Sequence, residues 1–256
     1  MITRNEGITC MGASKGMITQ EALLTTGKAK AVYETSDPKI LWLHSLDQAT
    51  ALNGKQKEHI TDKGRLTTQI SGLLFEMLNQ AGIKTHYLSP VDETDILVAR
   101  LTMLPIEVVV RNFAAGHFAS RFDVEPMTPL VPVVNEYYYK RDDLDDPALN
   151  ASQAVALKLA TPAQLAEISD ITAHVNQLLT EKFKTIGITL LDFKIEFGLD
   201  DQGALVLGDE LSPDNMRLID DATGASLDKD VFRRGEGDLR DGYEIVLHRL
   251  NETKGE

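Results

Sequence analysis

In the stretch LLDFKIEFG at positions 190–198, apolar and charged side chains alternate from Leu191 to Phe197. Asp192, Lys194 and Glu196 fall at alternate positions, and every residue between them is apolar. Because neighbouring side chains of a β-strand point to opposite faces, this pattern predicts a strand with one wholly apolar face and one face that reads acid, base, acid. The apolar face must pack against a hydrophobic core, so any fold of this chain must set a β-sheet on a core at this point.

The residues that follow predict a hairpin partner for this strand. In the register that we expect, Lys194 lies opposite Asp209, and Glu196 converges with Asp209 on the same face. Two convergent carboxylates beside a lysine suit Mg²⁺ bound together with the phosphates of a nucleotide. A ladder of solvent-facing salt bridges is the alternative, and for this strand taken alone it is the more common arrangement.

The loop after the hairpin favours a binding site over a salt-bridge ladder. The sequence GDELSPDNMR gathers Asp209, Glu210, Asp214 and Arg217 directly after a strand. Loops at strand ends are where binding and catalytic residues collect, because they can diverge without disturbing the sheet.

Periodicity and turn residues predict the remaining elements in outline. Short strands are expected at 29–35, 40–46, 84–88, 95–101 and 106–113, and a helix at 65–82. The proline-rich stretch 125–134 is expected to be irregular, and 135–150 to begin as a short strand and end in an acidic turn. The longest helix is expected at 161–187, with Thr161 as its N-cap, Pro162 in its first position and Gly187 as its stop, and another helix ends the chain.

This order of strands and helices predicts an α+β protein of two lobes with a cleft between them. We expect a flexible extension at 1–20, an N-terminal lobe at 21–101 made of antiparallel strands with one helix, and a larger C-terminal α+β lobe at 102–256.

Composition excludes some functions. The formal net charge of −13 disfavours nucleic acid and anionic membranes as partners. No apolar run approaches the roughly 20 residues of a membrane span, and the first residues lack the apolar core of a signal peptide. A single cysteine, Cys10, rules out an internal disulfide and suits a reducing compartment. We therefore expect a soluble cytoplasmic protein, and a homo-oligomer of unspecified stoichiometry.

Several motifs in the same order resemble the SAICAR synthetase family of purine biosynthesis. They are GKAKAVYET, DQATALNG with DKGRLTTQISGLLFEML, LPIEVVVRNFAAG, YYYKRDDLDDPALN, and the run from LLDFKIEFG through GDELSPDNMRLID to LDKDVFRR. The resemblance extends from about Leu23 to Leu250. It implies a kinase-like or ATP-grasp-like architecture with ATP between an N-terminal antiparallel lobe and a larger α+β lobe.

The resemblance also implies an activity and a set of site residues. The family joins L-aspartate to 5-amino-1-(5-phosphoribosyl)imidazole-4-carboxylate and cleaves ATP to ADP and phosphate, with Mg²⁺. Carried onto this sequence, the metal residues are Glu196 and Asp209, and the catalytic residues are Lys194, Asp192 and Arg217. The nucleotide residues are Gly27, Lys28, Lys30, Arg100, Leu101, Met103 and Lys140. The residues around the imidazole ribonucleotide are Arg111, Gly116, His117, Ser120, Asp146, Asp214, Arg217 and Arg233.

The implied chemistry explains these residue types. A carboxylate becomes an acyl donor when ATP phosphorylates it, and the aspartate amine can then attack the acyl phosphate. Lysines at 28, 30 and 194 suit the gathered phosphoryl charge, whereas Arg111 and Arg217 suit bidentate binding of phosphate or carboxylate. Asp192 is a candidate to accept the proton of the attacking amine.

One residue departs from the family pattern. The family usually reads AAGS where this chain reads Ala114-Ala115-Gly116-His117. His117 can still donate a hydrogen bond, or Ser120 or a water can replace the missing serine. This substitution leaves open a related ATP-dependent ligase or small-molecule kinase with another acceptor, and a nucleotide-binding protein without turnover is a third hypothesis. The other histidines show no ligand spacing and are assigned no role: His44, His59, His86, His174 and His248.

Overall fold

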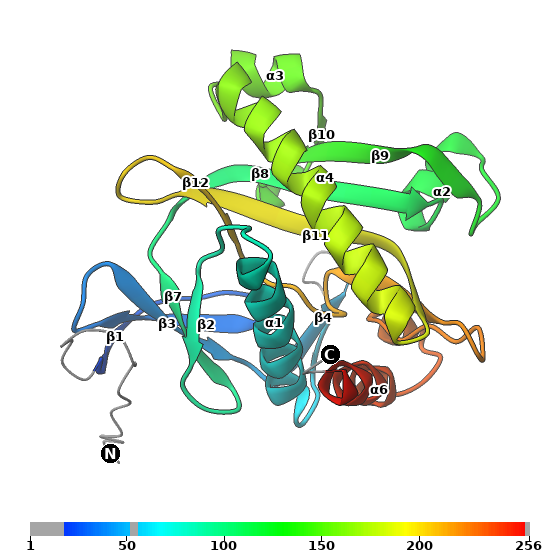
Figure 1. Cartoon of the computed structure of the whole chain (residues 1–256), viewed down its shortest axis with the longest axis horizontal. Helices are drawn as coiled ribbons and strands as arrows, with labels where there is room; N and C mark the ends of the chain where they lie inside the picture. The colour runs from blue at the N-terminus through cyan, green and yellow to red at the C-terminus, as the bar shows by residue number, and fades with distance from the viewer. Residues whose placement is uncertain (1–17, 52–55, 254–256) are drawn as a thin grey trace.

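The computed structural model describes residues 18–51 and 56–253, which form two larger antiparallel sheets, a small hairpin and several helices (Figure 1). The first sheet has the order β1 (Gln20–Thr26), β2 (Lys30–Thr35), β3 (Ile40–Ser45), β7 (Asp95–Ala99) and β6 (Tyr87–Pro90). The small hairpin pairs β4 (Gln48–Ala51) with β5 (Gln56–His59). The predicted α+β class with antiparallel sheets is confirmed.

The second sheet is built around one long strand. Its order is β10 (Ala148–Leu149), β9 (Pro129–Tyr139), β8 (Thr102–Phe113), β11 (Ile188–Leu199) and β12 (Leu205–Gly208). The first part of β11 also pairs with β13 (Met216–Asp220), so β11 has neighbours along both edges. β11 contains the alternating charged stretch, and Phe193, Ile195 and Phe197 lie in the hydrophobic core, as predicted. Leu191 is buried as well, but an irregularity in the pairing between Leu190 and Asp192 places Leu190, and not Leu191, in that core.

The helices pack on the sheets and on one another. Most of the helical residues lie in α1 (Lys63–Gln80), α4 (Pro162–Thr185) and α6 (Leu239–Glu252). The shorter pieces are α2 (Gly116–Phe122), α3 (Ala151–Ala156), α5 (Asp230–Arg234) and the 3₁₀ turn Asp142–Leu144. Helix α4 runs diagonally across β11, and α1 lies between the two sheets, where it contacts β3, β6, α4 and α6 (Figure 1).

Helix α4 begins and ends where its sequence signals predict. The Thr161 side chain accepts a hydrogen bond from the backbone N–H of Gln164, and the Gln164 side chain accepts one from the N–H of Thr161. This reciprocal capping box satisfies two of the N–H groups that a helix start leaves unpaired. After the last turn, Gly187 adopts φ 68°, the left-handed conformation that terminates many helices.

Segment 125–134 corrects the prediction of an irregular proline-rich stretch. From Pro129 onward the chain is strand β9, which pairs with β8 over most of its length. Two features accommodate the prolines at 129 and 132: on its other side β9 pairs only at Tyr137 and Tyr138, and its register with β8 shifts opposite Arg111–Phe113. Proline is tolerated at such edge and irregular positions because no ladder N–H is needed there.

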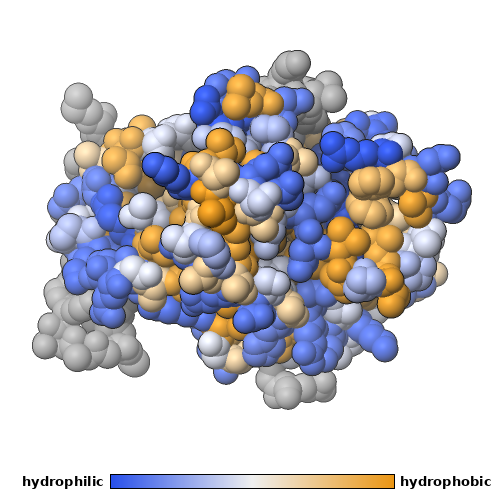
Figure 2. Space-filling model, turned by 90° about the horizontal axis from the view of Figure 1, so that it is seen from above, coloured by the Kyte–Doolittle hydropathy of each residue, from blue (hydrophilic) through white to orange (hydrophobic). Residues whose placement is uncertain are grey.

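The surface mixes polar and apolar residues. Figure 2 shows separate apolar areas among polar ones on the face seen from above. Exposed apolar side chains of the described chain include Phe122, Met127, Val131 and Val133, which run from the end of α2 into β9. Within the described ranges, no helix is long and apolar enough to cross a membrane.

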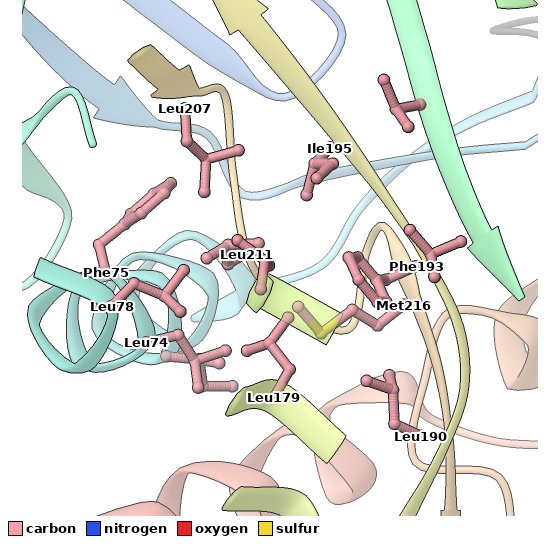
Figure 3. Close-up of a cluster of buried hydrophobic side chains, with 14 of the residues drawn as sticks. Leu74, Phe75, Leu78, Leu179, Leu190, Phe193, Ile195, Leu207, Leu211 and Met216 are labelled. Atoms are coloured by element: carbon pink, nitrogen blue, oxygen red, sulfur yellow. The ribbon is translucent and has the colours of Figure 1, made fainter. Parts of the chain in front are cut away.

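One hydrophobic core serves both larger sheets. Figure 3 shows side chains of α1, α4, β11 and β12 pointing into one cluster, with Phe75, Leu179, Phe193 and Leu207 among them. The first sheet adds Leu43 and Val98 to the same core. The change from one sheet to the other falls between Ala99 and Thr102.

The expected lobes at 21–101 and 102–256 share this core, and their status as separate units stays a prediction. Of the expected flexible extension at 1–20, positions 1–17 lie outside the described residues. Ile18 is buried in a small cluster with Ile40, Trp42 and Leu97, and Gln20 begins β1.

The core position of Phe183 makes it a test of this packing. Its ring, in the last turns of α4, is fully buried. We expect Phe183→Ala to lower the free energy of unfolding by about 3–5 kcal/mol, because it leaves a cavity between α4 and the sheet. The exposed neighbour Lys184 provides the control, and Lys184→Ala should stay within about 0.5 kcal/mol of the parent protein. Urea unfolding followed by circular dichroism measures both, and equal effects would contradict this placement of α4.

Candidate active site

The charged face of β11 lies inside the protein. Asp192 and Glu196 expose only 3% and 1% of their surface, so the alternative of a solvent-facing ladder is wrong for these two residues. Lys194 and Glu196 line a large cavity with a volume of about 590 Å³. A buried charge is tolerated only when partners compensate it, so the neighbours of this face determine its chemistry.

The hairpin corrects the predicted register by one residue. Glu196 pairs with Gly208, so Lys194 does not lie opposite Asp209. A regular strand in this register would turn Asp209 to the apolar face. Instead β12 ends at Gly208, and Asp209 adopts a left-handed φ of 62°. Its carboxylate then reaches the Nζ atom of Lys194 at 3.0 Å, so the two acids converge despite the wrong register.

A compact network of lysines and carboxylates results. Lys194 contacts Glu107 at 3.1 Å, Asp209 at 3.0 Å and also Glu196. Lys140 reaches the other oxygen of Glu196. On the opposite wall, Lys30 of β2 pairs with Glu210 at 2.6 Å and with Asp209 at 3.3 Å. The network thereby joins the first sheet to the second.

The charge states in this network follow from burial and from the neighbouring charges. Burial favours the neutral form of Lys30 and Lys194, yet the facing carboxylates outweigh it and raise the pKa of both amines. Burial, and then the charge of Asp209, raise the pKa of Glu196. Burial would also raise the pKa of Asp209, but Lys194 and Lys30 outweigh it and hold that pKa well below its usual value.

Glu196 and Asp209 fit a divalent cation by their chemistry. Carboxylates supply the hard oxygen ligands that Mg²⁺ prefers, and Mg²⁺ needs only one or two of them because it keeps several waters and shares substrate phosphates. Over residues 18–51 and 56–253 there is no cluster of three or more His, Cys, Asp or Glu arranged as a metal site. The two acids therefore suit a cation that arrives with phosphate oxygens better than one held by a protein cage.

A second charged group lies further along the same face of β11. Asp192 accepts hydrogen bonds from Arg111 at 2.7 Å and from Arg217 at 2.9 and 3.1 Å. Arg217 also donates to Asp230 at 2.8 Å, and Asp230 pairs in turn with Arg233. The cross-strand pairing of Asp192 with Arg111 on β8 and with Arg217 on β13 places both guanidinium groups beside one carboxylate.

Gly116 makes room for this arginine pair. It has φ +52°, and a Cβ atom there would lie 2.5 Å from Nη2 of Arg217. Beyond it, a smaller cavity of about 360 Å³ is lined by His117, Ser120 and Asp146 among others. Asp146 also lines the larger cavity, so the two hollows meet at this residue.

The structure gathers most of the residues proposed from sequence. The large cavity is lined by Gly27, Lys28, Lys30, Leu101, Met103, Lys140, Asp146, Lys194, Glu196, Asp209 and Asp214. Arg100 is not among its lining residues, because its guanidinium group donates to the carbonyl oxygen of Pro38 at 2.7 Å and pairs with Glu34. Asp214 lies apart from the arginine pair, since it accepts hydrogen bonds from Lys63 and from the hydroxyl of Tyr243, both at 2.6 Å.

Sequence reasoning missed several cavity residues. Glu107, Glu210 and Lys229 line the cavity, as does His86, and Lys63 lies behind it with 1% of its surface exposed. Lysine at a helix start is usually solvated, so nothing in the spacing marked Lys63 as buried. Glu210 belongs to the charged loop expected after the hairpin, but the pattern assigns it no role, and the spacing of the histidines gives no signal for His86.

Replacement of Gly116 tests the role of close packing on Arg217. Gly116→Ala forces a left-handed alanine and pushes Cβ into the guanidinium group, so we expect a loss of about 2–4 kcal/mol in the free energy of unfolding. Gly224 is the matched control, because it has φ +71° and open space where a Cβ atom would lie. Gly224→Ala should lower the free energy of unfolding by only the cost of a left-handed alanine backbone, about 1–2 kcal/mol. Denaturant unfolding compares them, and equal losses would mean that Arg217 moves aside freely.

Asp214 gives the site a pH-dependent contribution to stability. Burial would raise its pKa, but Lys63 and then Lys229 outweigh burial and lower the pKa below the ordinary value of 3.8. A lowered folded-state pKa stabilises the protein above pH 3.8, and this stabilisation is lost as the pH falls from 3.8 toward the folded value. Asp214→Asn should therefore be destabilised most above pH 4, and the difference from the parent should shrink on further acidification.

Unfolding measurements from pH 7 down to pH 3 follow this difference. The surface variant Asp201→Asn, which removes a pair between exposed side chains of Lys39 and Asp201, serves as the control and should show little effect at any pH. A difference for Asp214→Asn that stays constant or grows below pH 4 would contradict the assignment.

Comparisons with known proteins agree over most of the chain. The family model described as SAICAR synthetase matches residues 23–250. Phosphoribosylaminoimidazole-succinocarboxamide synthase of Lacticaseibacillus paracasei is 56% identical over 230 residues, which are 90% of this chain and 95% of that protein. The crystal structure of the enzyme of the same name from Ehrlichia chaffeensis matches with a TM-score of 0.88 at 40% identity, over 90% of this chain and 98% of that one. A SAICAR synthetase in complex with ADP gives a TM-score of 0.86 at 39% identity, over 91% and 99% of the two chains. This chain therefore belongs to the SAICAR synthetase family.

Proposed function

We propose that this protein is an ATP-dependent ligase that joins L-aspartate to 5-amino-1-(5-phosphoribosyl)imidazole-4-carboxylate and releases ADP and phosphate. The observation that carries the proposal is the buried acid–base–acid face of β11, which lies between Lys30 on one side and Arg111 on the other, in a chain of this family. Family membership alone supports the reaction, and this face supplies the charged groups that the reaction needs.

The large cavity suits a nucleotide in one orientation. Its lining combines apolar side chains, with Val32, Leu101 and Met103 among them, and the lysines 28, 30 and 194. An aromatic base fits the apolar side chains and the phosphates fit the lysines, which can offset their charge. The ADP bound to the related SAICAR synthetase supports this use of the site.

Glu196 and Asp209 would hold Mg²⁺ together with the phosphates. When bound, the ion supplies neutralising charge to the phosphoryl oxygens. Lys194 lies between the two acids and is kept protonated by them, so it remains a cation next to the transferred group. Lys140, on the far oxygen of Glu196, fixes the orientation of that carboxylate.

The reaction proceeds in two balanced steps. An oxygen of the substrate carboxylate attacks the γ-phosphorus of ATP, the bond to the β-phosphate oxygen breaks, and ADP leaves. The neutral aspartate amine then attacks the carbonyl carbon of the acyl phosphate, phosphate leaves with the bonding electrons, and the amine loses a proton. Lysine ammonium groups offset the charge that gathers in the first step, and fixed positioning lowers the entropic barrier of both.

Asp192 fits a positioning role better than the role of proton acceptor. Both of its oxygens accept hydrogen bonds from guanidinium groups, and the side chain is buried. We infer that it orients Arg111 and Arg217 toward the anionic groups of the imidazole ribonucleotide. Gly116, His117, Ser120 and Asp146 would complete the pocket for that substrate where the two cavities meet.

The second candidate function is ligation to an amine other than aspartate. It is favoured by His117, which lines the smaller cavity in place of the serine usual in the family. Turnover with a panel of amines separates the two functions. Aspartate as the best acceptor supports the proposal, and a clearly preferred different amine supports the alternative.

We also infer a homo-oligomer in the cytoplasm. The exposed apolar side chains of Phe122, Met127, Val131 and Val133, between the end of α2 and β9, offer surface that a second copy could cover. Light scattering gives the mass in solution.

The central prediction concerns the two acids. Glu196→Gln and Asp209→Asn should each lower kcat by at least about 100-fold, because each removes a proposed metal ligand and one carboxylate of the lysine network. The assay measures aspartate-dependent ADP release with ATP, Mg²⁺ and the imidazole carboxylate nucleotide. Asp201→Asn, an equal change of charge on the surface, should keep parental kcat. Parental rates in both site variants would refute the metal assignment, and no aspartate-dependent ADP release by the parent protein would refute the ligase.

A further inference from the structure

Asp142 is an acid of the large cavity to which the reaction described above gives no role. It begins the 3₁₀ turn that follows β9 of the second sheet, and it lines the cavity. Lys28 also lines the cavity, from the turn between β1 and β2 of the first sheet. The Nζ atom of Lys28 donates to Oδ1 of Asp142 at 2.7 Å, so this ion pair joins the two sheets at the cavity.

The pair lies where the cavity opens to solvent. The side chains of Lys28 and Asp142 are 43% and 67% exposed, whereas those of Lys194 and Glu196 are 24% and 2% exposed. An ion pair between such exposed side chains is weak, because water hydrates both partners and salt screens their attraction. A ligand with a stronger claim on the lysine can therefore replace the acid.

The backbone on both sides of the pair is held by other contacts. The Gln48 side chain donates to the carbonyl oxygen of Lys28 at 2.7 Å. The N–H of Arg141, next to Asp142, donates to the carboxylate of Asp146 at 2.8 Å. Loss of the ion pair thus leaves both turns in place, and only the Lys28 side chain has to turn from Asp142 to a ligand.

The competition for Lys28 defines the ligand that would displace Asp142. A lysine ammonium group is a point charge on a flexible stem, and it binds a carboxylate or a phosphate oxygen alike. A polyphosphate carries several negative charges, whereas Asp142 carries one. Lys28 is one of the three lysines proposed above to receive the nucleotide phosphates, together with Lys30 and Lys194. Asp142 and a phosphate therefore compete for one ammonium group, and this competition lowers the affinity for the nucleotide.

We propose that Asp142 restrains nucleotide binding: its carboxylate holds Lys28 at the opening of the cavity, and a nucleotide phosphate displaces it. Asp142 acts through Lys28, so it is a positioning residue and takes no part in the transfer of the phosphoryl group. The proposal rests on the proposed function only for the presence of a nucleotide in this cavity.

Calorimetric titration with ATP, without the other substrates, tests the proposal. Asp142→Asn should tighten ATP binding about two- to fivefold, which corresponds to the loss of one exposed ion pair. Asp142→Glu keeps a carboxylate within reach of Lys28 and should bind ATP as the parent protein does. Asp143→Asn is the matched control, because Asp143 pairs with Arg141 and is not among the described lining residues. Its ATP affinity should stay within about 1.5-fold of the parent.

Lys28→Met separates the ion pair from a general effect of charge. This variant should bind ATP more weakly, and adding Asp142→Asn to it should change the affinity by less than about 1.5-fold, because the contested ammonium group is gone. A similar gain in both backgrounds would mean that Asp142 merely repels the phosphates through space, and it would overturn the proposal. Unchanged or weaker ATP binding by Asp142→Asn alone would overturn it as well.

The titration also keeps this proposal distinct from the proposed ligase. It needs no turnover, so a protein that binds ATP but does not ligate aspartate still gives a decisive result for Asp142. A parent protein that binds no ATP would overturn the role of Asp142 together with the nucleotide site.

Discussion

The compensation of buried charge on β11 is the constraint on which the rest of the site depends. Asp192 and Glu196 are almost wholly buried on a strand whose other face belongs to the core. Removal of such carboxylates from water is unfavourable unless cations and donors replace the lost hydration. The compensating cations are Arg111 on β8, Arg217 on β13 and Lys194 on β11 itself. The first sheet adds Lys30, so it is tied to the second by charge as well as by packing.

This compensation gives the cavity two electrostatic regions. Around Glu196 and Asp209 the lysines leave the charge nearly balanced, so added phosphates need an added cation. Around Asp192 the two guanidinium groups are also paired with other carboxylates, Arg111 with Glu136 at 2.5 Å and Arg217 with Asp230 at 2.8 Å, so an anion that binds there competes with these acids. A nucleotide with its metal in the first region and an anionic substrate in the second would lie side by side on one strand. Such an arrangement places reacting groups without a large conformational change.

Two residues with left-handed backbone conformations allow the charged groups beside β11 to take their positions. Asp209 turns out of the β12 ladder at φ 62°, and Gly116 at φ +52° admits the Arg217 side chain within a distance that no Cβ could allow. An aspartate tolerates this conformation better than most residues, and at Gly116 the absence of a side chain is required. The strain at Asp209 is compensated by its contacts with Lys194 and Lys30.

The sequence alone determined the features that depend on local spacing. The alternation at 191–197 defined the strand and its charged face, and Thr161, Pro162 and Gly187 defined the limits of α4, because periodicity and caps act over a few residues. The ordered motifs determined the family and most of the acidic and basic residues that line the cavity. Only the tertiary structure decided the hairpin register, the strand at 129–139, the exclusion of Arg100 from the cavity, and the burial of Lys63 and His86. These features depend on which distant groups compete for each side chain: Glu34 and the Pro38 carbonyl hold Arg100 away, whereas His86 is enclosed by Phe75 and the end of β12. Such competition involves residues far apart in the chain, and no local pattern records it.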